Sequence, residues 1–146
     1  RGEMTPGEIG RIVGVASRLG INKLKVTGGE PLMREDIVDI IRLTSPHVKE
    51  VSMTTNAIKL PEKAKALAKV GLKRVNISLH SLRRESVKRI AGVDCLDGVL
   101  AGIKAADEAG LKPIKLNFVV MKGLNSGEIP EMLRLSAESG AILQLI

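Results

Sequence analysis

A short glycine-rich segment, Thr27 to Pro31, carries residue types that are well suited to hold a small ligand. Gly28 and Gly29 let backbone N–H and C=O groups approach a ligand closely, and the Glu30 carboxylate can accept hydrogen bonds from an ammonium group. The same residues could also form an ordinary turn. The segment has neither the Walker phosphate-loop spacing nor the dinucleotide glycine fingerprint, so it supports neither of those nucleotide-binding modes.

Two further groups of polar residues, Thr54–Asn56 and Ser78–His80, stand at the ends of apolar segments. Their hydroxyl and amide groups donate and accept hydrogen bonds, which suits a carboxylate, a ribose or a base. Capping of strand ends is the alternative for each group. The chain has 2 histidines and 1 cysteine. We therefore expect no metal site, and we expect Cys95 to be a packed free thiol.

Alternating helices and strands must position these residues. Helical periodicity and capping signals, including a capping box at Thr5–Glu8, predict helices over 5–20, 34–45, 61–71, 85–90, 97–109 and 126–140. Strands are predicted over 23–27, 50–54, 74–79, 114–120 and 142–146, and a glycine precedes all but the second of them. This alternation is typical of a parallel sheet in one α/β domain that spans 1–146.

Within the predicted strands, polar and apolar residues alternate. Strands buried on both faces would be continuously apolar, so the apolar face is expected to pack on the helices and the polar face to line an interior. Lys25 and Lys115 fall on the polar face, where each needs an anion such as an acidic side chain or a phosphate. The alternative is a ladder of polar residues that satisfy one another. Five strands cannot close a barrel of six or eight, so we expect an internal piece of a longer protein.

Composition excludes several classes of function. The net charge of +7 suits an anionic partner, although a solvated lysine-rich surface explains it equally well. With no Trp, no Tyr and one Phe, the chain lacks aromatic residues for base stacking, so we expect no nucleic-acid partner. No apolar run could span a bilayer, and cysteine usage suggests a reducing compartment, hence a cytoplasmic protein. The open edges of the sheet would allow pairing with a second copy.

Taken together, three segments of the sequence resemble the core of radical S-adenosylmethionine (SAM) enzymes. They are Lys25-Val26-Thr27-Gly28-Gly29-Glu30-Pro31-Leu32-Met33-Arg34, Thr54-Thr55-Asn56 and Asn76-Ile77-Ser78-Leu79-His80. Lys115-Leu116-Asn117 and Val119-Val120-Met121-Lys122-Gly123-Leu124-Asn125 narrow the resemblance to the molybdenum cofactor biosynthesis protein A family, the GTP 3′,8-cyclases. The resemblance covers essentially the whole chain.

This resemblance implies part of an incomplete (β/α)6 TIM-like barrel. In the family, a [4Fe–4S] cluster binds SAM and generates a 5′-deoxyadenosyl radical, which converts GTP to 3′,8-cyclo-7,8-dihydro-GTP in the first step of molybdenum cofactor synthesis. The resemblance implies that Gly28, Gly29, Glu30 and Ser78 bind SAM. It also implies that Lys25, Thr54 and Lys115 bind GTP.

The chain departs from the family pattern in several places. The C-x3-C-x2-C loop of the first cluster and the cysteines of a second cluster are absent, so this chain alone is expected to be inactive. Lys25 replaces a common arginine, and His80 stands where aspartate is common.

Three other interpretations stay open. A radical SAM enzyme that modifies peptides or other cofactors would share the Gly28–Pro31 segment. A non-radical (β/α) protein that binds phosphorylated ligands would keep the lysines, and a basic nucleic-acid-binding module would show salt-dependent binding.

Overall fold

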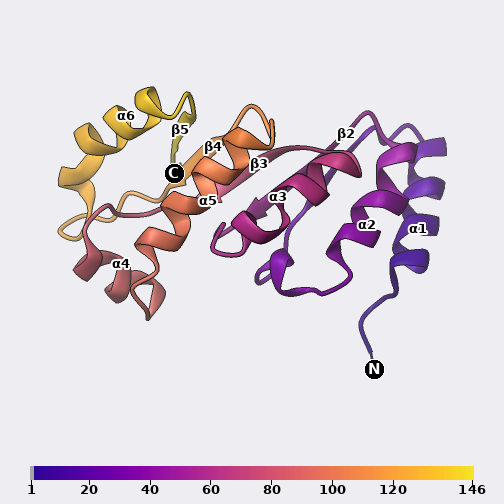
Figure 1. Ribbon diagram of the computed structural model, residues 1–146, viewed down its shortest axis with the longest axis horizontal. Helices are drawn as coiled ribbons and strands as arrows, with labels where there is room; N and C mark the ends of the chain where they lie inside the picture. The colour runs from indigo at the N-terminus through magenta and orange to yellow at the C-terminus, as the bar shows by residue number, and fades with distance from the viewer. Residues whose placement is uncertain (1) are drawn as a thin grey trace.

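The five strands of the sheet pair in the order in which they follow one another along the chain (Figure 1). The computed structural model describes residues 2–146, and all neighbouring strands are parallel. The strands are β1 (Lys23–Val26), β2 (Glu50–Thr55), β3 (Leu72–Ser78), β4 (Lys115–Phe118) and β5 (Ile142–Leu145). Parallel neighbours need a crossover connection, and at least one helix lies between each strand and the next.

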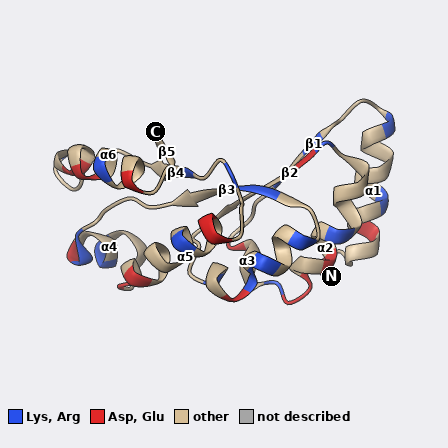
Figure 2. Cartoon of the chain, turned by 45° about the horizontal axis from the view of Figure 1, so that its top comes forward, with Lys and Arg blue, Asp and Glu red and all other residues tan. Residues whose placement is uncertain are grey.

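Six α-helices and three short 3-10 segments complete the described part of the chain. The helices are α1 (Pro6–Arg18), α2 (Ile37–Thr44), α3 (Leu60–Lys69), α4 (Arg84–Ala91), α5 (Leu96–Glu108) and α6 (Ile129–Glu138). The 3-10 segments are η1 (Pro31–Met33), η2 (Ser45–His47) and η3 (Ser126–Glu128). Helices α2, α3 and α5 lie along one side of the sheet (Figure 2), and each carries both acidic and basic residues, as expected for solvated helices.

Helix α1 begins at the predicted capping box. The backbone N–H of Thr5 donates to Glu8 Oε2 at 2.8 Å, and the Glu8 N–H donates to Thr5 Oγ1 at 3.3 Å. The hydrogen bonds from Thr5 lower the pKa of Glu8. Pro6 occupies the first helical position, where its missing N–H costs no hydrogen bond.

Four helices end in the same way ahead of a strand. In each, the cap residue is followed by a glycine with positive φ: Gly20, Gly71, Gly110 and Gly140. This left-handed conformation lets the chain turn sharply from helix to strand. At Gly71 space is also short, because a Cβ there would lie 2.6 Å from the Ser45 side chain. The glycines that precede four predicted strands are therefore helix ends.

Two predicted helix starts are wrong. The sequence predicts a helix from Arg34, but Pro31 opens the 3-10 segment η1, Arg34 is extended, and α2 begins at Ile37. The sequence predicts the last helix from Ser126, but residues 126–128 form η3 and α6 begins at Ile129. Pro130 explains the second difference, because proline has no N–H to donate and is accommodated only in the first turn of an α-helix.

The two faces of the sheet differ as the alternation predicts. One face is apolar and fully buried against the helices, with Val51, Met53, Val75, Ile77, Leu116 and Phe118 each at most 1% exposed. We call the other the polar face, and it carries Lys25, Ser52, Thr54, Arg74, Asn76, Ser78, Lys115 and Asn117.

The sheet does not close within residues 2–146, because β1 and β5 each pair on one side only. This confirms that five strands leave the barrel open, while pairing with a second copy stays a prediction. No helix among the described residues is both long enough and apolar enough to cross a membrane.

Candidate functional site

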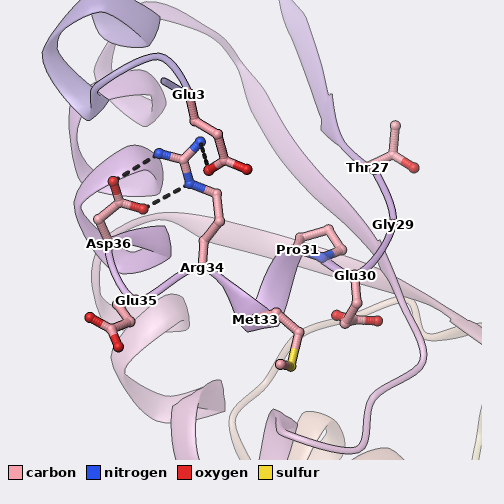
Figure 3. Close-up of a pocket in the computed structure, with 10 residues that line it drawn as sticks. Glu3, Thr27, Gly29, Glu30, Pro31, Met33, Arg34, Glu35 and Asp36 are labelled. Carbon is pink, nitrogen blue, oxygen red and sulfur yellow. Dashed lines mark hydrogen bonds and ion pairs between the residues drawn. The ribbon is translucent and has the colours of Figure 1, made fainter. Parts of the chain in front are cut away.

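The segment Thr27–Pro31 leaves β1 and borders a pocket of about 790 Å³ (Figure 3). A Cβ placed on Gly28 or Gly29 would meet no heavy atom within 4 Å. The backbone of both glycines therefore faces open space that a ligand can occupy. A ligand-binding role for the two glycines stays a prediction.

The Glu30 carboxylate binds the loop that follows β2. Its Oε1 accepts from Thr55 Oγ1 at 2.7 Å and from the Leu32 N–H at 3.0 Å, and its Oε2 accepts from the Asn56 N–H at 2.7 Å. Thr55 is 3% exposed. Sequence reasoning assigned Glu30 to an ammonium group and missed these partners, which join the ends of β1 and β2. Each carboxylate oxygen has two lone pairs, so Oε2 still has room for one further donor.

Arg34 forms the opposite wall of the pocket in Figure 3, between Glu3 and Asp36. Its guanidinium donates to Asp36 at 2.8 Å through both Nε and Nη2, donates to the Met4 carbonyl at 2.9 Å, and lies 3.3 Å from Glu3. The hydrogen bonds from Arg34 lower the pKa of Asp36. The residues that lead into α1 are thus fastened beside the Gly28–Pro31 loop. The Arg-x-Asp spacing of Arg34 and Asp36 was the sequence signal that could have predicted this ion pair.

The parallel register arranges the polar face in three rows. Nearest the carboxyl ends of the strands, Ser78 pairs with Asn117. One row deeper, Thr54, Asn76 and Lys115 are neighbours across β2, β3 and β4. Deepest are Lys25, Ser52 and Arg74, across β1, β2 and β3. The sequence-predicted residues Lys25, Thr54, Ser78 and Lys115 therefore share one face, and Gly28–Glu30 lie at its edge.

The expectation that an interior position makes each lysine require an anion is wrong for Lys25. Lys25 is exposed, because β1 is an edge strand within the described residues, so its ammonium group is not desolvated and does not require an anion. Lys115 is half-buried. Neither lysine forms an ion pair with any residue of 2–146, since the acid of this face, Glu50, binds Arg74 at 3.0 Å. Both lysine charges are therefore available to a ligand.

A buried oxygen without a partner lies beside Ser78. Asn117 Oδ1 is inaccessible and accepts no hydrogen bond from any described residue. A buried acceptor left unpaired costs about 1–3 kcal/mol.

His80 joins the ends of β3 and β4. Its Nδ1 accepts from the Val119 N–H at 3.2 Å, and burial lowers its pKa. Because Nδ1 accepts, the neutral ring carries its proton on Nε2. A carboxylate at this position could accept the same bond. Cys95 is half-buried before α5 and packs against the core as a free thiol, which confirms its predicted role.

The fold and this site are those of a known class of protein. The chain belongs to the radical SAM superfamily, whose family profile matches residues 1–136. It is 58% identical over 146 residues to a protein of Thermococcus kodakarensis named probable GTP 3′,8-cyclase, a match that covers 100% of this chain and 47% of that relative. It is 46% identical over 147 residues to the GTP 3′,8-cyclase of Paenarthrobacter nicotinovorans, a match that covers 98% of this chain and 41% of the relative. The chain spans about half the length of the curated relatives it matches.

Solved structures share the fold. Streptococcus suis SuiB bound to S-adenosylmethionine has a TM-score of 0.85 and 24% sequence identity, and the match covers 99% of this chain and 34% of SuiB. This likeness, together with the parallel sheet, confirms the predicted fold class of a partial radical SAM core barrel.

Proposed function

We propose that this chain forms the SAM- and GTP-binding core of a GTP 3′,8-cyclase. The names of the curated relatives support this activity. The observation that supports a binding site on the polar face is the strand register, because it puts Thr54 and Lys115 one row below Ser78. Groups suited to two different ligands thus lie in adjacent rows.

The residues near the strand ends fit SAM. The open space at Gly28 and Gly29 leaves room for its amino-acid part, and the remaining lone pair on Glu30 Oε2 suits its ammonium group. The Ser78 hydroxyl, in the row nearest the carboxyl ends of the strands, suits a ribose hydroxyl group. When bound and reduced, SAM supplies the radical that starts the reaction. The chain itself orients that ligand at the edge of the polar face.

The residues of the deeper rows fit the triphosphate of GTP. Lys25 and Lys115 have no acidic partner among residues 2–146, and phosphate oxygens accept hydrogen bonds from ammonium groups. Thr54 adds a hydroxyl group between the two lysine-bearing strands. The chain does not fit a [4Fe–4S] cluster, because it has 1 cysteine. The cluster ligands of the whole enzyme must come from outside these residues.

The test compares SAM and GTP affinity in the full-length protein. Lys115→Ala should weaken GTP binding much more than SAM binding, and Ser78→Ala should weaken SAM binding or its reductive cleavage first. Lys104→Ala is the matched control, because Lys104 is an exposed lysine of α5 with only a 3.9 Å contact to Glu108. Equal losses for both ligands, or no loss, would remove the assigned roles.

A further inference from the structure

The amide of Asn76 lies on the polar face between the two residues proposed to contact GTP. Thr54 of β2 and Lys115 of β4 are its neighbours in register, and neighbouring strands lie about 4.8 Å apart. Asn76 is 5% exposed. Its surroundings therefore decide which way the amide group points.

Arg74 fixes that orientation. Arg74 Nη1 donates to Asn76 Oδ1 at 3.3 Å. A guanidinium group donates hydrogen bonds and accepts none, so the amide atom that faces Arg74 must be the oxygen. The amide nitrogen and its two N–H groups face away from Arg74, and the bond from Arg74 is the one side-chain hydrogen bond that Asn76 makes within residues 2–146.

Glu50 in turn holds Arg74. Its Oε1 lies 3.0 Å from both Nε and Nη2 of the guanidinium group. The Arg74 and Glu50 side chains are 20% and 28% exposed, so the pair is partly shielded from water. One carboxylate thus occupies one edge of the guanidinium group, and Nη1 is left to bind Asn76.

The middle row of the polar face consequently presents three donors in sequence. They are the Thr54 hydroxyl, the Asn76 amide N–H groups and the Lys115 ammonium group. Phosphate oxygens accept hydrogen bonds, and donors that carry or adjoin positive charge bind them most strongly. Glu50, the acid nearest to this row on β2, is already paired with Arg74.

We infer that Asn76 is a phosphate-binding residue for the nucleoside triphosphate substrate and that Arg74, held by Glu50, is its positioning residue. The inference rests on the proposed function and deepens it, because it adds a donor between Thr54 and Lys115. Asn76→Asp is the informative change. The new carboxylate has the same shape, pairs with Arg74 through one oxygen, and turns the other oxygen toward the phosphate in place of a donor.

The experiment measures equilibrium binding of GTP, guanosine and inorganic triphosphate to the full-length protein. Asn22→Asp is the control, because it adds the same charge at an exposed position outside the polar face. Loss of a hydrogen bond to a charged group predicts about ten- to hundredfold weaker binding of GTP and triphosphate by Asn76→Asp. Guanosine affinity should not change, and Asn22→Asp should match the wild type. Thermal unfolding of each variant verifies that it is folded.

The outcomes separate this inference from the proposed function. If the wild type binds GTP and Asn76→Asp binds it equally well, or loses GTP and guanosine alike, the inference is overturned and the proposed function stands. If the wild type binds triphosphate through Asn76 but does not bind GTP, Asn76 is a phosphate-binding residue, its assignment to GTP is overturned, and the proposed function falls. Binding of neither ligand by the wild type would overturn both.

A double-mutant cycle tests the positioning role of Arg74. Arg74→Lys keeps a cation for Glu50 but cannot bind Glu50 and Asn76 with one planar group. It should weaken triphosphate binding in the wild-type background and have no further effect when Asn76 is alanine. Full additivity of the two changes would mean that Arg74 acts on the phosphate directly, and would overturn the positioning role.

Discussion

The hydroxyl group of Ser81 lies 2.8 Å from both carboxylate oxygens of Glu128, although 47 positions separate the two residues. Ser81 is fully buried and Glu128 is 2% exposed. The same carboxylate accepts from the Leu82 N–H at 2.7 Å, and Asn125 Nδ2 donates to the His80 carbonyl at 2.6 Å. The loop after β3 is therefore fastened to the segment between β4 and α6, and this fastening supports the strand end that carries Ser78.

Removal of the Glu128 carboxylate should destabilise the fold. Glu128→Ala leaves the Ser81 hydroxyl and the Leu82 N–H without an acceptor, which predicts a loss of about 2–4 kcal/mol in the free energy of unfolding. Glu138→Ala, a change at an exposed glutamate of α6, the helix that follows Glu128, should stay within about 0.5 kcal/mol of the wild type. Urea denaturation measures both values. A Glu128→Ala variant as stable as the wild type would mean that water replaces the carboxylate without cost.

Glu30 and Thr55 should be energetically coupled. Glu30→Gln replaces one acceptor oxygen by a donor, and Thr55→Val removes the hydroxyl group that binds the carboxylate at 2.7 Å. Contacting residues of this kind show interaction energies of about 0.5–3 kcal/mol when the free energies of unfolding are compared in a double-mutant cycle. The cycle of Glu35→Gln with Thr55→Val is the control, because Glu35 is an exposed acid of the same loop. Independent effects of Glu30 and Thr55 would contradict the hydrogen bond.

His80 should make stability depend on pH below about 6.5, the ordinary pKa of histidine. Burial lowers its pKa in the folded chain, so the unfolded chain binds more protons in the range between the two pKa values. The free energy of unfolding therefore rises with pH across this range, and the contribution of the neutral His80 is lost as the pH falls. His80→Gln should flatten this part of the profile, whereas His47→Gln, a change at an exposed histidine, should retain it. Identical profiles for the wild type and His80→Gln would refute the prediction.

Two glycines of α5 should respond in opposite ways to alanine. A Cβ on Gly102 would lie 2.3 Å from the Ala57 carbonyl oxygen, whereas a Cβ on Gly98 would meet only ordinary contacts with Ile58 at 3.4 Å or more. Gly102→Ala should lower the free energy of unfolding by about 1–3 kcal/mol through overpacking. Gly98→Ala should raise it by up to about 1 kcal/mol through helix propensity. Thermal and urea unfolding of both variants check the sign of each effect.

The alternation of polar and apolar residues was sufficient to predict the two faces of the sheet. Side-chain direction in a strand has a period of two residues, so Ile77 and Ser78 must face opposite ways whatever the neighbouring strands do. The helix ends at glycine were also predictable, because they too depend on the local chain and not on contacts between strands. Left-handed backbone and a sharp exit from a helix are requirements of the local chain.

Contacts between strands could not be read from the sequence. The register of β2 and β3 shifts between Val51 and Ser52, and the sequence carries no obvious sign of such an irregularity. The alternation of residues in β3 puts Arg74 on the polar face, but it does not identify Glu50 of β2 as its partner. Sequence reasoning likewise overestimated the burial of Lys25, because exposure depends on whether another strand covers β1.

The sheet order β1-β2-β3-β4-β5 has a consequence for synthesis on the ribosome. Each new strand that emerges pairs with the one made just before it, so no strand has to wait for a segment that has yet to be translated. The growing edge is always the most recent strand, and contacts between neighbours in sequence form faster than those between distant segments. The chain can thus assemble vectorially, one strand and one crossover at a time, during translation.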